Sequence, residues 1–384
     1  MNREWFERVI DRSGTHSVKW DVADGELPMW VADMDFAIAP AIQEAVMKRA
    51  AHPVFGYNTI PAAWNEAYVN WWRTRHDFTM DPDWLIFTTG VIPGLSTSVR
   101  RLTAPAEKVL IQSPVYNIFY NSILNNGRVL LDSPLTYDGE RFGIDWEDFE
   151  QKISDPQCAM FVLCNPHNPV GRIWTREELN RIGELCERHH VTVVSDEIHC
   201  DITAPGKAYV PFASVSETCK RISVTLIAPT KAFNLAGLQT AAVMVPDETL
   251  RHKAWRALNN DEVAEPNAFA VDAAIAAFTH GAEWLDAMRA YVEDNKDYVR
   301  GFVAEHIPEM RVPRSEATYL LWLDCTRLTE DSKAFAKEIR QKTGLYLSNG
   351  AQYGGAGTGF LRMNLACPRS YVEDGMRRLK EAVR

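Results

Sequence analysis

The chain has 384 residues, enough for two or three domains, and its 46% hydrophobic and 24% charged residues are typical of a globular protein. Its formal net charge of −10 and the lack of a long basic run argue against binding to nucleic acid or to an anionic membrane surface. Seven scattered cysteines without a CxxC pair predict reduced thiols in a cytoplasmic protein rather than disulfides or a zinc site.

The start of the chain does not have the pattern of a targeting segment. Residues 1–5 carry two charges where a signal peptide would have an apolar run. The longest uncharged stretch, 109–127, contains Pro114 and four asparagines, which a membrane-spanning helix would not tolerate. We therefore expect neither a signal peptide nor a transmembrane helix.

Six short apolar segments in the first two thirds of the chain predict buried strands. They are β-branched or aliphatic runs, as expected for strands covered on both faces. We predict them at 84–88, 108–112, 160–164, 192–195, 223–227 and 241–245. Amphipathic helices are predicted between them, one with Ile92, Leu95 and Val99 on a single face and another that begins at the Thr175 capping box. This alternation predicts a doubly wound α/β domain.

After about residue 247 the pattern changes to long helices and separate strands. Helices are predicted at 247–259, 267–307, 331–343 and 371–383, with strands at 319–324 and 360–366. The first forty or so residues are rich in loops and could pack against this α+β part. We therefore expect a large α/β domain over residues 46–280 and a smaller α+β domain formed by 1–45 and 281–384.

Two candidate binding features follow the first two predicted strands. A helix is predicted to begin within Thr88–Ile92, where exposed N–H groups form an anion site and Gly90 permits close approach. Tyr116 follows the second strand and could stack on a planar ring, although an isolated aromatic side chain is more often part of a core.

The third predicted strand is followed by two Asn-Pro steps and a glycine, in residues 164–172. One Asn-Pro step would indicate an ordinary turn. Two within five residues at a strand end indicate a stiff, shaped site instead. The side chain of Asn168, held in such a turn, can donate a hydrogen bond to a phenolate oxygen.

The fourth predicted strand ends at the block Ser195–His199, which contains Asp196. A carboxylate at the carboxyl edge of a parallel sheet can pair with a protonated pyridine nitrogen. The alternatives are an ordinary loop carboxylate or a metal cluster with neighbours up to Asp201. Because alternating side chains point to opposite faces of a strand, we expect no metal site in this block.

Lys231 follows the fifth predicted strand, directly after Thr230. Burial there would lower the pKa of the amine and make it nucleophilic towards an aldehyde, while Thr230 could bind a phosphate oxygen. The alternative is a solvated lysine in a loop, which is the usual case. Arg362 lies in an otherwise apolar strand, and a buried arginine needs an anion, for which its planar fork favours a carboxylate.

In this order, the motifs resemble those of fold-type I pyridoxal-5′-phosphate (PLP) enzymes, the aminotransferase-like superfamily, over essentially the whole chain. The resemblance is closest to the MalY/PatB-type C–S lyases, which are cystathionine β-lyase-like. It is carried by the segments Arg12–Asp21, Met29–Phe36 and Phe55-Gly56-Tyr57. The run Trp30–Phe36 is the most specific of these.

The resemblance implies a role for each candidate residue. Lys231 would hold PLP as a Schiff base and act as general acid and base, with Asp196 on the pyridine nitrogen. The other implied cofactor-binding residues are Gly90, Val91, Ile92, Tyr116, Asn168, His199 and Thr230. Arg362 would bind the substrate carboxylate, and Tyr57 would reach the phosphate of a neighbouring subunit, which implies a homodimer. His199 and Gln239 depart from the tyrosine and arginine of many aminotransferases.

The resemblance therefore implies a PLP-dependent β-lyase that cleaves cystathionine or related cysteine thioethers to a thiol, pyruvate and ammonia. An aminotransferase using the same residues is the first alternative. A regulatory role, in which the protein binds a transcription regulator, is an alternative of another class and would be an additional function.

Overall fold

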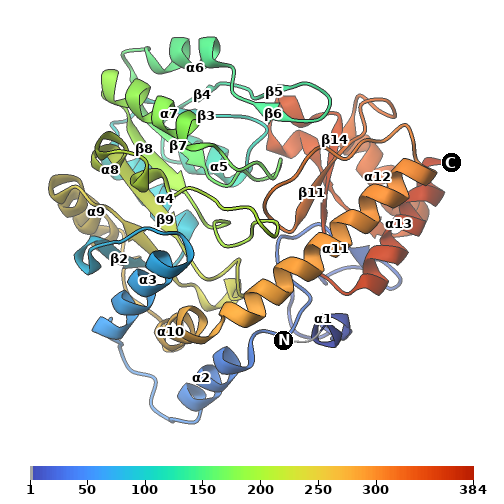
Figure 1. Cartoon of the computed structure of the whole chain (residues 1–384), viewed down its shortest axis with the longest axis horizontal. Helices are drawn as coiled ribbons and strands as arrows, with labels where there is room; N and C mark the ends of the chain where they lie inside the picture. The colour runs from blue at the N-terminus through green and yellow to red at the C-terminus, as the bar shows by residue number, and fades with distance from the viewer. Residues whose placement is uncertain (1–2) are drawn as a thin grey trace.

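The computed structural model describes residues 3–384 and is built around a seven-stranded sheet with the order β2-β10-β9-β8-β7-β3-β4 (Figure 1). Its strands are β2 (Leu85–Thr88), β3 (Lys108–Ile111), β4 (Val129–Asp132), β7 (Cys158–Cys164), β8 (Thr192–Asp196), β9 (Ser223–Ile227) and β10 (Ala241–Met244). All neighbours pair in parallel except β10, which is antiparallel to both β2 and β9. The sheet is therefore mostly parallel, as a doubly wound α/β fold requires.

All six predicted strands belong to this sheet, with ends that agree within two residues. The strand β4 was not predicted. It lies at the edge of the sheet, beside β3 alone, and its residues are only partly buried. An edge strand needs no continuous apolar run, so the pattern used to find the central strands does not detect it.

Helices cover both faces of the sheet, and the alternation of side chains along the strands separates two apolar layers. One layer joins Val109, Val162 and Val194 to helices α4, α5 and α9, and the other joins Leu110, Phe161 and Val193 to α6 and α7. These helices are α4 (Val91–Leu102), α5 (Ile118–Leu124), α6 (Trp146–Ile153), α7 (Arg176–Arg188) and α9 (Glu248–Asn260).

The predicted capping box at the start of α7 is present. The side chain of Thr175 accepts a hydrogen bond from the Glu178 backbone N–H at 3.2 Å, and the Glu178 carboxylate accepts one from the Thr175 N–H at 2.8 Å. Two N–H groups that the helix cannot satisfy are thereby paired.

A second, three-stranded sheet with the order β11-β14-β13 lies beside the larger one, and the long helix α11 extends from α10 towards it (Figure 1). Its strands are β11 (Leu320–Asp324), β13 (Ser348–Asn349) and β14 (Phe360–Asn364). The helices of this part are α10 (Ala270–His280), α11 (Ala282–His306), α12 (Ser332–Thr343) and α13 (Arg369–Val383). The single helical stretch predicted over 267–307 is thus two helices, since Gly281 interrupts it.

The N-terminal segment packs against the C-terminal part of the chain. Strand β1 (Leu27–Pro28) pairs in parallel with β12 (Leu345–Tyr346), and Met29 belongs to the same apolar cluster as α12 and α13. The remaining elements are α1 (Glu4–Glu7), α2 (Pro40–Ala50), α3 (Ala62–Arg75), α8 (Glu217–Ile222), β5 (Thr136–Tyr137) and β6 (Phe142–Gly143).

Among the described residues, no helix is both long enough and apolar enough to cross a membrane. The signal-peptide prediction concerned residues 1–5, of which 1 and 2 lie outside the described residues.

Candidate active site

The candidate residues gather where strands of the large sheet end. Asp196 is the last residue of β8, Asn168 follows β7, and Lys231 follows β9. Arg362 reaches the same place from β14 of the small sheet. The charges of Asp196 and Arg362 both act on the Lys231 amine, and Arg362 donates a hydrogen bond to Asn168. The fold therefore joins side chains that the sequence separates by up to 194 positions.

The amine of Lys231 lies in a largely dehydrated position. Burial, followed by the repelling charge of Arg362, lowers the pKa of Lys231 to about 8, while Asp33 and Asp196 act in the opposite direction. The Nζ atom donates a hydrogen bond to the carbonyl oxygen of Ala32 at 2.5 Å. At pH 7 about a tenth of this amine is therefore neutral and nucleophilic, far more than for an ordinary lysine with a pKa of roughly 10.4.

Asp196 is a buried carboxyl group without a full counterion. Burial raises the pKa of Asp196 to about 7, and its neighbour Glu197 adds to the effect. The backbone N–H of Ile198 donates a hydrogen bond to Asp196 Oδ1 at 3.1 Å, which favours the charged form. A carboxylate held this way is stabilised by a cationic group, such as a protonated ring nitrogen.

Arg362 and Asn168 form a polar pair in the wall of the site. Arg362 Nη1 donates to Asn168 Oδ1 at 3.2 Å, and Nη2 donates to the Trp30 carbonyl at 2.9 Å. The Nε atom of Arg362 is buried without a hydrogen-bond partner among the described residues, and the guanidinium lies 4.9 Å from the centre of the Tyr353 ring. Because Asn168 uses its oxygen here, its amide NH₂ remains the group that can donate to a ligand.

His199 and Tyr116 lie close to the charged side chains of the site, those of Lys231, Asp196 and Arg362. Burial, together with Lys231 and Arg362, lowers the pKa of His199 to about 3, so its imidazole is neutral, and its Nδ1 atom is buried without a partner among the described residues. Tyr116 is close enough for Arg362 and Asp196 to act on its hydroxyl, whose pKa is raised chiefly by burial.

The predicted anion site also has the required local structure. Gly90 caps the N-terminus of α4, and Val91 and Ile92 form its first turn, where N–H groups have no acceptor within the helix. The backbone of Gly90 is extended, so this residue is not needed for a left-handed turn; a β-carbon there would lie 3.1 Å from Pro93 Cδ. Thr230 is buried, next to Lys231.

Tyr57 is the candidate residue that is exposed, whereas the others are buried or half-buried. Its side chain is fully exposed, on the loop that follows α2, with Val54 and Phe55 also exposed on the same loop. This loop and residues 266–269 line a shallow pocket together with Gln239.

Sequence reasoning missed the groups contributed by the run Trp30–Phe36. The carbonyl of Ala32 accepts hydrogen bonds from both Lys231 and Tyr319, the latter at 2.9 Å. Asn364 donates to the carbonyls of Val31 and Asp33, at 2.6 Å each. The run itself was noted as specific to a family, but backbone contacts leave no mark in the side-chain pattern.

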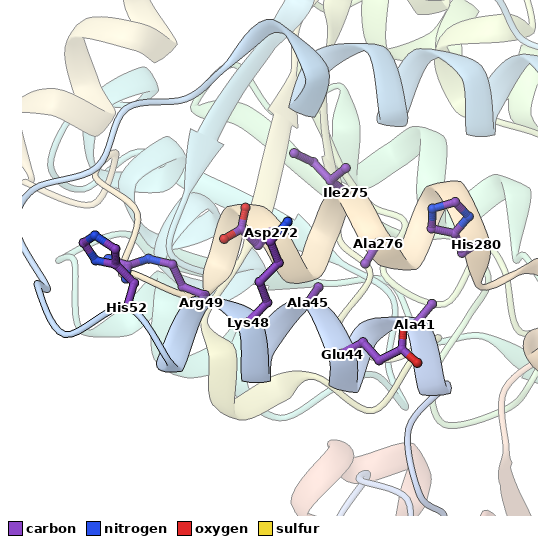
Figure 2. A pocket seen from close by; sticks show the side chains of 10 residues that line it. All are labelled: Ala41, Glu44, Ala45, Lys48, Arg49, His52, Asp272, Ile275, Ala276 and His280. Carbon is purple, nitrogen blue, oxygen red and sulfur yellow. The ribbon is translucent and has the colours of Figure 1, made fainter.

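A larger groove, of about 720 Å³, lies away from these residues, between α2 and α10 (Figure 2). Lys48 extends from α2 towards Asp272 on the facing helix, and Ala45 and Ala276 lie between the two helices. None of the candidate site residues lines this groove.

Comparisons with known proteins agree with the fold and with the resemblance seen in the sequence. The chain is 42% identical to the cystathionine β-lyase PatB of Bacillus subtilis (strain 168), over 98% of this chain and 99% of that protein. A PLP-bound putative aminotransferase from Clostridium difficile 630 superimposes with a TM-score of 0.96 at 39% identity, covering 99% of both chains. A PLP-bound C–S lyase from Staphylococcus hominis superimposes with a TM-score of 0.93 at 30% identity, covering 99% of this chain and 98% of that one.

The family model for aminotransferase class I and II matches residues 28–379. This match includes every strand of both the seven-stranded and the three-stranded sheet and all candidate site residues. The chain therefore belongs to the class I and II aminotransferase family.

Proposed function

We propose that this protein is a PLP-dependent lyase that cleaves the Cβ–S bond of cystathionine or a related cysteine thioether. The observation that carries the proposal is the meeting of a buried amine, a buried carboxyl group and a buried guanidinium, from Lys231, Asp196 and Arg362. The similarity to PatB, named a cystathionine β-lyase, and to a PLP-bound C–S lyase supports the same activity.

The site has groups that match those of PLP. Lys231 supplies a partly neutral amine for the aldehyde of PLP. Burial raises the pKa of Asp196, and the cationic ring nitrogen would stabilise its carboxylate. The buried Nδ1 of His199 and the amide NH₂ of Asn168 could bind polar substituents of the PLP ring. The N–H groups at the start of α4 and the hydroxyl of Thr230 could bind its phosphate. When bound, PLP acts as an electron sink for negative charge that develops at the substrate Cα.

Three residues of this chain then have separate roles in the reaction. Arg362 holds the substrate carboxylate by its planar fork, which orients the Cα–H bond. Lys231, once free and neutral, removes the Cα proton, and its low pKa keeps it able to do so near neutral pH. The carboxylate of Asp196 keeps the ring nitrogen protonated.

Elimination follows from the substrate's own chemistry. The electron pair of the broken Cα–H bond forms a Cα–Cβ double bond, and the Cβ–S bond breaks to release a thiolate, which takes up a proton. The aminoacrylate released afterwards reacts with water to give pyruvate and ammonia. No second substrate is needed, which distinguishes this reaction from transamination by the same residues.

We also propose that two copies of the chain share the active site through Tyr57. A fully exposed tyrosine beside exposed Val54 and Phe55 is costly in an isolated chain but favourable in an interface. Phe55 contacts Phe269, with ring centres 5.9 Å apart, so this loop packs against the residue that precedes α10. A partner placed on this surface would bring its own Tyr57 to the phosphate end of the site.

We keep the predicted domain division, with residues 46–280 in one domain and 1–45 and 281–384 in the other, as a proposal. The pairing of β1 with β12 supports the joint domain of the two termini. Phe6, Phe36 and Ile42 argue against a boundary at residue 45, because they pack in the apolar cluster that contains α3 and α10.

We further propose that the protein works in the cytoplasm. Its seven cysteines are all free and all buried in the structure, which suits a reducing compartment.

When cystathionine is the sole substrate, we expect sustained release of thiol, pyruvate and ammonia in equal amounts, because expulsion of the thiolate needs no co-substrate. The three products are followed together over many turnovers. A reaction that stops after one equivalent, leaves pyridoxamine phosphate and resumes when a keto acid is added would identify an aminotransferase instead.

Replacing Arg362 by lysine should lower kcat/KM for cystathionine by about tenfold to hundredfold, because one charge-assisted hydrogen bond of roughly 1.5–3 kcal/mol is lost. The control is Arg340→Lys, since Arg340 makes a similar two-bond contact, to Glu26, outside the site. Steady-state kinetics should show the loss in the first variant alone. Equal kinetics for Arg362→Lys and the wild type would contradict the assignment.

After removal of PLP, the rate of its covalent reattachment should rise with pH through about 8, because only the neutral Lys231 amine reacts. In Arg362→Gln the repelling charge is gone, the pKa of Lys231 rises, and the midpoint should move to higher pH. Rapid-mixing absorbance measures both profiles. A midpoint near the roughly 10.4 of an ordinary lysine in the wild type, or a downward shift in the variant, would be inconsistent with this site.

Mixing inactive Tyr57→Ala and Lys231→Ala proteins should restore activity, because a mixed dimer contains one intact site. Random re-pairing returns up to about a quarter of the wild-type activity. The control mixture, Asp196→Asn with Lys231→Ala, places both changes in residues of the same subunit's site and should restore nothing. Equal activity in the two mixtures, or a monomer at working concentration, would rule out the shared site.

A further inference from the structure

A second group of reactive side chains lies outside the candidate active site, where the end of α3 meets the loop that follows β8. It consists of His76, Cys200 and Asp201, and their ligand atoms all lie within 4.8 Å of one another. The strand pattern that disfavours a metal concerns only residues 196–201. It could not include His76, which is 125 positions away from Asp201 in the chain.

Asp201 is a buried carboxylate that is only half satisfied. Its side chain is 1% exposed, and its Oδ1 atom accepts hydrogen bonds from Trp71 Nε1 and His76 Nε2, at 2.8 Å each. Its Oδ2 atom is buried and has no hydrogen-bond partner among the described residues. Leaving a charged oxygen in this state is costly, so the position favours an additional positive ligand.

Cys200 supplies a soft ligand next to this oxygen. Its side chain is buried, with the sulfur close to the ligand atoms of His76 and Asp201. Without a metal the thiol is only a weak S–H donor. A thiol that coordinates a metal ion is deprotonated and binds as a thiolate.

The group is accessible through a small polar cavity of about 200 Å³, which His76, Cys200 and Asp201 line together with cationic residues. Each of these cations already has a carboxylate: Arg75 and Arg289 contact Asp286, and Lys207 contacts Glu316. Their charges are thereby largely balanced, and the cavity leaves room for a water molecule as a further ligand.

We propose that His76, Cys200 and Asp201 form a zinc-binding site, with water from the cavity as the fourth ligand. One nitrogen, one thiolate and one carboxylate oxygen match the ligands that zinc prefers. Tetrahedral zinc places such ligand atoms roughly 3.3–3.6 Å apart, so modest side-chain rotations close the site. On binding, Cys200 loses its proton to solvent, and His76 carries its remaining hydrogen on Nδ1 instead of Nε2.

The site is tied to the loop that follows Asp196. The ring of His76 packs on Tyr209 at 4.8 Å, and the Tyr209 hydroxyl donates to Glu197 at 2.7 Å. Glu197 also accepts hydrogen bonds from Ser195 and from the backbone of Phe212. Zinc bound here would stabilise the conformation of this loop, so it should raise the thermal stability of the PLP-loaded protein.

The test is zinc binding by the PLP-loaded protein, with zinc chloride and a competing chelator that sets the free zinc concentration. Metal content is measured after gel filtration for the wild type, His76→Asn, Cys200→Ser and the control Cys186→Ser, which alters a buried thiol in α7. We expect one tightly bound zinc per chain in the wild type and the control, and at least about tenfold weaker binding in the other two. PLP absorbance confirms that each variant is folded.

Cobalt(II) gives a second readout, whose first measurement uses the wild type alone. Cobalt bound to the wild type should show a thiolate-to-metal absorption band, measured by difference against the same protein without cobalt. The band should persist in Cys186→Ser and vanish in Cys200→Ser. A wild type that takes up no zinc at micromolar free metal, or a Cys200→Ser protein that binds zinc as tightly as the wild type, would overturn the proposal.

Discussion

The site depends on the burial of one amine among opposing charges. Lys231 is removed from water beside Arg362, and both effects favour its neutral form, while Asp33 and Asp196 oppose them. Because of this balance, the pKa of Lys231 lies near 8, within reach of neutral pH. A lysine in solvent would be almost fully charged there and would neither attack an aldehyde nor accept a proton from carbon.

The N-terminal segment holds the two sheets in the arrangement that this balance requires. Its carbonyls from Trp30, Ala32 and Asp33 accept hydrogen bonds from Arg362, Lys231 and Asn364. Arg362 and Asn364 belong to β14 of the small sheet, and Lys231 lies in the turn that follows β9 of the large one. Behind them, the buried Asp35 carboxylate pairs with Lys19 at 2.6 Å and with Arg12 at 2.8 Å. Two of the three segments that carried the family resemblance, Arg12–Asp21 and Met29–Phe36, therefore also fix the backbone over the site.

The fold and the strand-end residues could be predicted from the sequence because central strands and their loops leave strong local patterns. The edge strand β4 could not, since it lacks the continuous buried run of a central strand. The antiparallel direction of β10 could not either, because direction does not change the apolar pattern of a short strand. The carbonyl contacts of Ala32 and the meeting of His76 with Asp201 depend on long-range packing, which periodicity does not encode. Tyr57 was predicted only by resemblance, because its proposed contacts lie in another copy of the chain.

The central claim is that Lys231 is the residue that binds PLP. Its most direct test is borohydride reduction of the PLP-loaded protein, followed by proteolysis and mass spectrometry of the peptides. We expect the pyridoxyl group on Lys231, in the peptide that follows β9. A label on another lysine, or no change in absorbance when PLP is added to the protein, would contradict it.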